Sequence, residues 1–297
     1  MTKSFTYHLT LFVLKLKGLK KTFGQDPIDY KKLRKEDVHH PKKNFFKRIN
    51  YLQFKISKTI VTEIPQEQDS NKLLIFIHGG AFISGPAKHH WDSIKQIHQQ
   101  TNYTIWLCDY PKAPESKIDE ISKNLDEVYR QATEKYHPQE IVLLGDSVGG
   151  TLATALTQRL LQEKTPLPAK LILISPVLDA TMTNSEIDAI DKTDPMLSKP
   201  GVLSAKKMCA LANDLDNEMI SPIHGDFHDF PKTILFLAEN DITYPDQKRL
   251  VQKLKNAQVD TEIILGKGMP HIWPLLPVMK EATLALKKMI GLLNQEN

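Results

Sequence analysis

Six short apolar runs, separated by longer segments of helical character, constrain the fold of this chain more than any other feature. The runs do not alternate strictly between apolar and polar residues, which is typical of strands covered by helices on both faces of a parallel sheet. They cover residues 73–77, 104–108, 141–144, 170–174, 233–237 and 261–265. The intervening segments predict helices near 88–101, 117–136, 148–163 and 245–257, and a final helix from about 275 to 293. This alternation predicts a doubly wound α/β fold.

Three further segments complete the organisation of the chain. Residues 51–64 read as two more strands, expected to form an antiparallel hairpin at the edge of the sheet. Residues 1–50 precede the sheet, and residues 179–222 are much longer than an ordinary connection between two strands. We expect both to be helical additions that cover one edge of the sheet.

The charge of the chain is concentrated near its beginning. Residues 1–60 hold 15 basic and 4 acidic residues, whereas the remainder holds 24 and 31. We expect a solvated surface there, with contact to an anionic membrane or a nucleic acid as the alternatives. No nucleic-acid-binding motif accompanies the charge, so no nucleic-acid partner is predicted. The two cysteines, Cys108 and Cys209, form no metal-binding or disulfide pattern, which favours a cytoplasmic protein.

Residues 5–23 carry large apolar side chains at intervals of four and three residues, which is one face of an amphipathic helix. The apolar run inside this segment is too short for a signal peptide or a membrane span. We expect this face to pack on the protein as part of the helical additions, and we expect little binding to vesicles. Weak peripheral contact with a membrane is the alternative. The residues concerned are Phe5, Leu9, Phe12, Leu16, Leu19 and Phe23.

A Gly-Asp-Ser-Val-Gly-Gly segment joins the apolar run at 141–144 to the following helix and places Ser147 at the junction. Glycines permit a turn too sharp for other residues, and such a strand–turn–helix junction lifts a serine hydroxyl out of the sheet. A Gly-x-Ser-x-Gly match alone is weak evidence. Its position between a strand and a helix makes Ser147 a candidate nucleophile.

The loop His-Gly-Gly-Ala-Phe-Ile-Ser-Gly at 78–85 follows the first predicted parallel strand. Acyl transfer creates an oxyanion that needs backbone N–H donors, and glycines let such donors approach a substrate. Gly79, Gly80 and Ala81, together with Val148 after the nucleophile, form the predicted oxyanion hole. His78 is expected to be structural rather than a general base.

A base and an acid are expected in the loops after the last two predicted strands. His271 lies in a Gly- and Pro-rich loop after 261–265, and three acids, Glu239, Asp241 and Asp246, follow 233–237. Asp241 fits the acid position best, because Asp246 suits a helix cap and Glu239 a solvated surface. The order Ser147, Asp241, His271 is that of the α/β-hydrolase triad.

The other ten histidines are expected to be surface, cap or structural residues, without a carboxylate or cysteine placed to form a zinc set. No metal site is therefore predicted. These histidines are His8, His39, His40, His78, His89, His90, His98, His137, His224 and His228.

Together, these motifs resemble those of the hormone-sensitive-lipase-like family of α/β-hydrolases. The loop at 78–85 is similar to the family's His-Gly-Gly-Gly motif and the segment around Ser147 to its Gly-Asp-Ser-Ala-Gly-Gly elbow. Further similar segments are Asp-Tyr-Pro-Lys-Ala-Pro-Glu-Ser at 109–116, Asp-Pro-Met-Leu-Ser at 194–198 and residues 221–231. Two residues depart from the pattern: Ala81 replaces a glycine, and Val148 is bulkier than the usual small residue, so we expect a tighter acyl or alcohol site.

The resemblance implies an eight-stranded sheet (51–178 and 223–297) under a helical cap made from 1–50 and 179–222. It also implies hydrolysis of carboxylic esters of small molecules, usually with short-to-medium acyl chains, without a cofactor. A sugar or sterol ester deacetylase, an amidase, or a non-catalytic ligand-binding relative are the alternatives, since specificity resides in the cap and acyl pocket. The oligomeric state is not predicted.

Overall fold

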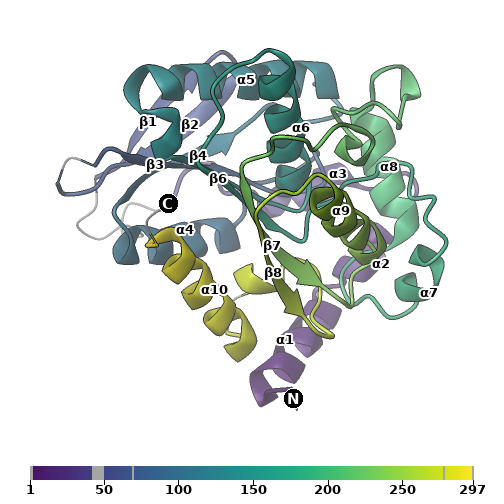
Figure 1. Cartoon of the computed structure of the whole chain (residues 1–297). Coiled ribbons are helices and arrows are strands. Elements are labelled where there is room, and N and C mark those ends of the chain that lie inside the picture. Colours follow the sequence, from purple (N-terminus) through teal and green to yellow (C-terminus); the bar gives the residue numbers. More distant parts are fainter. Residues whose placement is uncertain (1–2, 42–49, 69, 277, 296–297) are drawn as a thin grey trace.

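A single eight-stranded sheet runs through the molecule in the computed structural model, which describes residues 3–41, 50–68, 70–276 and 278–295 (Figure 1). The strand order is β1-β2-β4-β3-β5-β6-β7-β8. The strands are β1 (Leu52–Ile56), β2 (Thr59–Ile64), β3 (Lys72–Ile77), β4 (Tyr103–Asp109), β5 (Ile141–Asp146), β6 (Lys170–Ile174), β7 (Lys232–Ala238) and β8 (Thr261–Gly266). The predicted mostly parallel eight-stranded α/β-hydrolase sheet is confirmed.

The first two strands form the expected hairpin. Strand β1 pairs antiparallel with β2, and β2 pairs antiparallel with β4. All other neighbouring strands are parallel. The carboxyl ends of β3, β5, β6, β7 and β8 therefore meet at one edge of the sheet, where open α/β sheets bind their ligands.

Helices cover both faces of the sheet, which explains why the central strands are almost uniformly apolar and buried. Helices α4 and α10 contact each other on one face, whereas α5 and α6 contact each other on the other (Figure 1). Helix α9 packs against β7. These helices are α4 (Lys88–Gln100), α5 (Ile118–Lys135), α6 (Val148–Gln162), α9 (Tyr244–Asn256) and α10 (Lys280–Leu293).

The final helix begins later than predicted. Residues Trp273–Leu275 form a 3-10 turn instead, and α10 starts at Lys280. Prolines at positions 274 and 277 of the sequence explain the difference, because a proline disfavours helical backbone in the residue that precedes it.

The remaining helices are short and come from the two segments that were expected to form the cap. They are α1 (Phe5–Leu16), α2 (Leu19–Phe23), α3 (Tyr30–Leu33), α7 (Ile187–Asp191) and α8 (Lys199–Cys209). Helix α2 contacts α8, and Ser204 in α8 accepts a hydrogen bond from the N–H of Ile28 at 3.0 Å. We call these helices the cap helices. The division into 1–50, 179–222 and a core of 51–178 and 223–297 stays a prediction, and residues 42–49 lie outside the described residues.

The apolar face predicted for residues 5–23 does not pack on the protein along α1. Phe5, Phe12 and Leu16 are 81%, 57% and 70% exposed. The helix instead packs through the opposite face, where Tyr7 and Thr10 are buried. Their hydroxyls are satisfied by the carbonyl oxygens of Gly268 (3.0 Å) and Thr6 (2.8 Å), so burial of this polar face leaves no unpaired group.

The same segment is also not one continuous helix. Gly18 adopts a left-handed conformation with φ of 65° and separates α1 from α2. This break gives Leu19 and Phe23 a different orientation from the α1 stripe, and Phe23 is buried. Glycine is the residue that adopts this conformation most readily.

Candidate active site

Four strand ends carry the residues predicted for catalysis. The loop 78–85 follows β3, Ser147 follows β5, Asp241 lies beyond β7, and His271 lies beyond β8. These strands are parallel neighbours or next neighbours in the sheet, so their carboxyl ends lie close together. The fold thus brings four distant stretches of sequence to one rim.

Ser147 occupies a sharp turn between β5 and α6. Its backbone has φ of 53° and ψ of −122°, which is unusual for a residue with a Cβ, and its N–H donates to the carbonyl of Ile174 at 2.9 Å. At Gly149, two residues later, an added Cβ would overlap the carbonyl oxygen of Ile77. Glycine at this position lets α6 approach β3 closely and hold the serine at the rim.

The three predicted triad side chains form one chain of hydrogen bonds. His271 Nε2 lies 2.8 Å from Ser147 Oγ, and His271 Nδ1 lies 2.6 Å from Asp241 Oδ2. Because the ionised carboxylate of Asp241 can only accept, Nδ1 carries the proton and Nε2 accepts from the serine hydroxyl. This is the arrangement in which an imidazole can take a proton from a serine.

Asp241 is fully buried and held by several donors. Its Oδ1 accepts from both the N–H and the hydroxyl of Thr243 at 2.8 Å, and its Oδ2 also accepts from Gln247 Nε2 at 3.2 Å. Burial lowers the pKa of His271, but the charge and hydrogen bond of Asp241 outweigh it, so the pKa lies above the usual 6.5. The carboxylate therefore both orients the imidazole and stabilises its protonated form.

The loop after β3 presents free N–H groups beside Ser147. Gly80 has φ of +119°, and an added Cβ there would overlap the carbonyl oxygen of Ser84. Gly80 and Ala81 line the same pocket as Ser147, and Val148 opens α6, where the first N–H groups have no partner within the helix. Within the described residues, no acceptor is bonded to the N–H of Gly80, Ala81 or Val148.

Gly79 is a correction to the predicted oxyanion hole. Its N–H donates to Asp146 Oδ1 at 2.9 Å and is not free for a substrate. An added Cβ at Gly79 would also overlap Asp146 Oδ2. Gly79 therefore ties the loop after β3 to the turn that carries Ser147.

His78 braces the same loop, as expected from the sequence. Its ring is fully buried and stacks on Tyr110 with centroids 4.5 Å apart, and its carbonyl accepts from the Tyr110 hydroxyl at 2.8 Å. Burial lowers the pKa of His78 well below its usual value, so the ring is neutral. It has no contact with Ser147 or His271 that would make it a base.

A largely apolar pocket of about 780 Å³ opens onto the predicted catalytic residues. Ser147 and His271 lie on its wall together with Gly80 and Ala81. The rest of the lining comes mainly from the cap helices and the segment before α8, including Leu9, Val13, Phe23, Met196, Leu197 and Val202. A substrate in this pocket would contact the reactive serine at one end and apolar side chains from the cap at the other.

Comparison with known proteins agrees with this geometry. A family model described as the alpha/beta hydrolase fold matches residues 74–275. An esterase of Acinetobacter venetianus is 31% identical over 210 residues, which are 70% of this chain and 69% of the relative. The chain belongs to the alpha/beta hydrolase family.

Two further relatives narrow the comparison. An acetyl-hydrolase of Streptomyces hygroscopicus is 25% identical and is matched over 73% of this chain and 74% of its own. A protein of Staphylococcus aureus solved as a candidate esterase superposes with a TM-score of 0.88 at 29% identity, over 97% of this chain and 99% of that one. The hydrolase is thus a carboxylic ester hydrolase, and its predicted place among carboxylesterases of the alpha/beta hydrolase fold is confirmed.

Two histidines beside the pocket of the hydrolase lie closer to a carboxylate than the sequence suggested. His89, His90 and Asp146 have potential ligand atoms within 4.8 Å of one another. However, His90 Nδ1 accepts from the N–H of Ala87 at 2.8 Å, which leaves the ring proton on Nε2, facing Asp146 at 3.3 Å. With this tautomer Nε2 has no lone pair for a metal, so the group fits a hydrogen-bonded brace better than a metal site.

Asp194 is a site residue that the sequence reasoning missed. Its carboxylate accepts from the N–H groups of Met196 (2.7 Å), Leu197 (2.9 Å) and Ile242 (2.9 Å). It thereby joins the pocket wall at 196–197 to the loop that carries Asp241. Burial and the charge of Asp241 raise the pKa of Asp194 to about 6. Its motif at 194–198 was recognised, but nothing local indicates its partner 48 residues away.

The two acids that competed with Asp241 have other partners. Asp246 Oδ1 accepts from Arg249 at 2.9 Å and from Asn184 at 3.2 Å. Glu239 Oε2 accepts from the N–H of Gly268 at 2.6 Å. Neither carboxylate bonds to His271 in the part of the chain that the structure describes.

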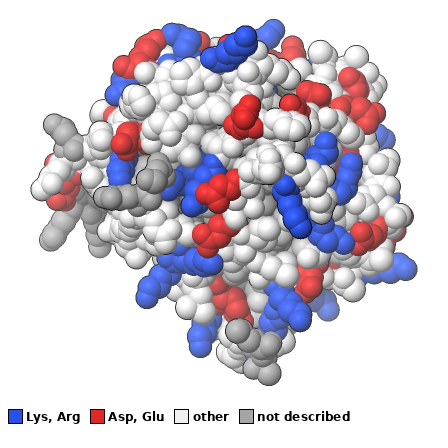
Figure 2. All heavy atoms as spheres, viewed as in Figure 1, with Lys and Arg blue, Asp and Glu red and all other residues white. Residues whose placement is uncertain are grey.

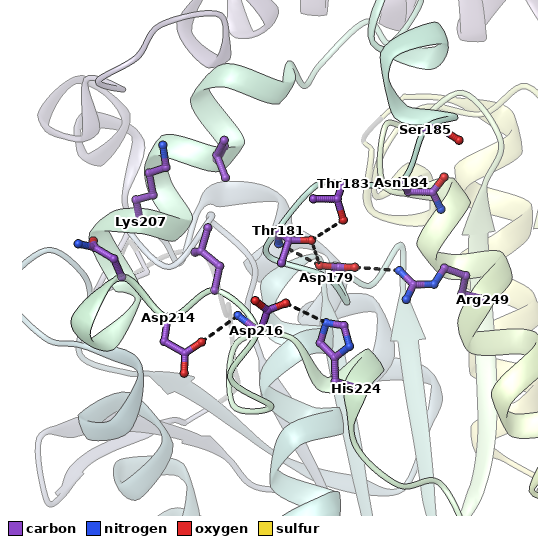
Figure 3. Close-up of a pocket in the computed structure, with 13 residues that line it drawn as sticks. Asp179, Thr181, Thr183, Asn184, Ser185, Lys207, Asp214, Asp216, His224 and Arg249 are labelled. Atoms are coloured by element: carbon purple, nitrogen blue, oxygen red, sulfur yellow. Dashed lines mark hydrogen bonds and ion pairs between the residues drawn. The ribbon is translucent and has the colours of Figure 1, made fainter.

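A second hollow, of about 830 Å³, lies apart from the triad between the segment after β6 and the turn after α8 (Figure 3). Two pairs of its polar side chains face each other: Arg249 binds Asp179 at 2.8 Å, and His224 faces Asp216 at 3.7 Å. No triad residue lines it. Of these two hollows, only the pocket at Ser147 is lined by predicted triad residues.

Proposed function

We propose that this hydrolase cleaves esters with short-to-medium acyl chains, with Ser147 as nucleophile, His271 as base and Asp241 as the residue that orients the base. The observation that carries this proposal is the unbroken hydrogen-bond chain from Ser147 through His271 to Asp241, with spacings of 2.8 and 2.6 Å. A receptor that only binds a ligand would not require such a chain.

In the first step, Ser147 Oγ attacks the ester carbonyl carbon, and its proton passes to His271 Nε2. Asp241 keeps the imidazole in the required tautomer and balances the positive charge of the imidazolium. His271 then donates the same proton to the departing alkoxide, which leaves as an alcohol. An acyl group remains esterified to Ser147.

The negative charge of the tetrahedral intermediate falls on the former carbonyl oxygen. The free N–H groups of Gly80, Ala81 and Val148 are the proposed donors to it. Loss of one such donor typically costs about 3–4 kcal/mol of transition-state stabilisation. The link between Gly79 and Asp146 holds two of these donors in position before a substrate arrives.

In the second half, His271 removes a proton from a water molecule as its oxygen attacks the acyl carbon. The bond between that carbon and Ser147 Oγ then breaks, His271 returns the proton to the serine oxygen, and the carboxylic acid is released. Both halves of the reaction need neutral His271. Because the pKa of His271 is raised above 6.5, kcat/KM should increase with pH through an inflection above that value.

The acyl range follows from the pocket. A volume of about 780 Å³ with mainly apolar walls suits an acyl chain of several carbons and leaves room for an alcohol group.

Hydrolysis of p-nitrophenyl acetate and butyrate by the wild type and by Ser147→Ala tests the proposal. We expect Ser147→Ala to lower kcat/KM by at least about 10⁴-fold. Ser185→Ala, which removes an exposed serine from the second hollow, is the matched control and should retain activity. Equal rates for wild type and Ser147→Ala would contradict the role of Ser147.

A fluorophosphonate probe should label the wild type at Ser147 and leave Ser147→Ala unlabelled. A protein that only binds ligands would stay unlabelled in both forms. An ester series from acetate to palmitate, with sugar, sterol and amide variants of the leaving group, then defines the substrate class.

The partners in this proposal are small-molecule esters. The cytoplasmic location predicted from the cysteines stays a proposal. None of the helices in the described residues is long and apolar enough to cross a bilayer.

A further inference from the structure

The outward face of α1 concentrates the exposed apolar surface of the molecule. Eleven large apolar side chains are exposed among the described residues, and five of them belong to this one helix of 12 residues. Isolated exposed apolar residues are ordinary, but a contiguous group marks an interaction site. The five are Phe5, Leu9, Phe12, Val13 and Leu16.

This face continues into the pocket that holds the catalytic serine. Leu9 and Val13 are exposed to solvent and also line that pocket, and Val278, 71% exposed, lies on the same lining. Apolar side chains therefore extend from the outer surface of α1 to the entrance that leads to Ser147. A molecule carrying an apolar chain could pass from a partner bound on α1 into the pocket without crossing open water.

The charges carried by the segment that contains α1 are of one sign. Residues 1–25 contain no Asp or Glu. Lys15 lies three residues after Phe12, so it neighbours the apolar stripe, and Lys15, Lys17 and Lys21 are exposed with no acceptor among the described residues. Lys20, by contrast, is bound to Asp191 at 2.8 Å. Figure 1 places α1 at the lower end of the molecule, and Figure 2 shows Lys and Arg side chains around that end, together with Asp and Glu side chains from other segments.

An apolar stripe flanked by unpaired lysines fits a lipid surface better than a second copy of this chain. Two copies joined through α1 would bring two sets of lysines together without an acid from the same segment to balance them. At a membrane, the apolar side chains enter the acyl boundary while the lysines stay among anionic headgroups. We propose that α1 docks the hydrolase on anionic lipid surfaces, with the pocket entrance facing the lipid.

Flotation with lipid vesicles tests this proposal independently of catalysis. Wild-type protein should float with vesicles of phosphatidylcholine mixed with phosphatidylglycerol, less with phosphatidylcholine alone, and less at high salt. The Ser147→Ala protein should float as well as the wild type. Docking can therefore fail or succeed separately from the proposed triad.

Two pairs of substitutions identify the surface. Phe12→Ser with Leu16→Ser, and Lys15→Glu with Lys21→Glu, should each reduce partition onto the mixed vesicles about tenfold or more. None of these four residues lines the pocket, so hydrolysis of soluble p-nitrophenyl acetate should be unchanged and should show that each variant is folded. Leu211→Ser with Leu284→Ser, and Lys123→Glu with Lys255→Glu, are matched exposed controls that should bind normally.

Absence of binding to the mixed vesicles would overturn the proposal. Equal losses in these two pairs of variants and in the controls would also overturn it, because binding would then not depend on this surface. Sedimentation velocity tests the other possible occupant of this face, a second copy of the chain. A dimer that dissociates in Phe12→Ser with Leu16→Ser, in a protein that does not bind vesicles, would assign the face to a second copy instead.

Discussion

The central strands and the cap helices differ in how fully their apolar side chains are buried. In β3, β5 and β6 nearly every side chain is buried and apolar, and each of the adjoining loops has a fixed place at the rim. The cap helices are short, expose the apolar face of α1, and are joined to the rest of the molecule partly through buried polar anchors such as Lys206 and Asp194. The sheet positions the predicted catalytic residues, whereas the cap provides most of the apolar pocket wall that a substrate would contact. Cap and sheet should therefore respond differently to substitution and to pH.

The largest effect is expected at the sheet-borne triad. In Asp241→Asn, an amide N–H would face His271 Nδ1 and place the ring proton on Nε2, where the base needs a lone pair. We expect kcat/KM to fall about 10⁴-fold without loss of folding. Steady-state hydrolysis of p-nitrophenyl butyrate measures it. Glu239→Gln and Asp246→Asn are the controls, and a loss as large in either of them would move the acid role away from Asp241.

Paired truncations test the packing difference directly. Leu144→Ala, in the fully buried strand β5, should lower the free energy of unfolding by about 2–5 kcal/mol. Leu16→Ala, on the exposed face of α1, should change it by less than about 0.5 kcal/mol. Urea denaturation followed by circular dichroism gives both values. Equal losses would mean that the α1 face is buried in solution.

Lys206 in α8 should make the stability of the protein depend on alkaline pH. Burial lowers its pKa to about 8 from 10.5, although the charges of Asp179 and Asp246 oppose this. Between these pH values the folded state is neutral at Lys206 and the unfolded state still binds a proton, so stability increases with pH. Relative to Lys206→Met, the free energy of unfolding of the wild type should rise by about 3 kcal/mol.

The exposed neighbour Lys207 supplies the control for this measurement, since Lys207→Met should follow the wild type at every pH. Parallel curves for wild type and Lys206→Met would show that Lys206 is solvated.

Asp194 should make the stability of the protein fall, rather than rise, with pH, and it should do so in the acid range. Its pKa is raised from 3.8 to about 6, so the folded state holds a proton that the unfolded state has lost, and stability falls as pH rises through this window. Against Asp194→Asn, the wild type should lose about 2 kcal/mol of unfolding free energy between these pH values. Denaturation of both proteins across this range provides the measurement, and Asp229→Asn is the exposed control. If the difference in unfolding free energy between the wild type and Asp194→Asn stayed constant with pH, the raised pKa of Asp194 would be refuted.

The strands and turns of the core could be predicted from the sequence because each is indicated by a short local pattern of residues. An unalternating apolar run such as 170–174 indicates a strand with two covered faces, and the glycines around Ser147 indicate a sharp turn at a strand end. The chain order of Ser147, Asp241 and His271 then follows from topology, since parallel strands deliver their ends to one rim. The observed strands differ from the expected runs by no more than two residues at either end.

The features that escaped prediction depend on partners distant in the sequence. The N–H of Gly79 looked available until the fold placed Asp146 beside it, 67 residues away. The buried face of α1 contains Tyr7 and Thr10, which a count of apolar spacing assigns to the solvent side. A prediction from apolar spacing assumes that burying these hydroxyls costs free energy, but their hydrogen bonds remove that cost. Tertiary contacts, rather than local preference, decided these cases.

The bond between the Gly79 N–H and the Asp146 carboxylate joins the β3 loop to the residue directly before the nucleophile. Transferring either loop alone to another protein would remove this hydrogen bond. The serine hydroxyl and the proposed oxyanion-hole N–H groups would then no longer be held in a fixed position relative to each other. Chimaeras and directed-evolution libraries based on this hydrolase should therefore keep the two loops together.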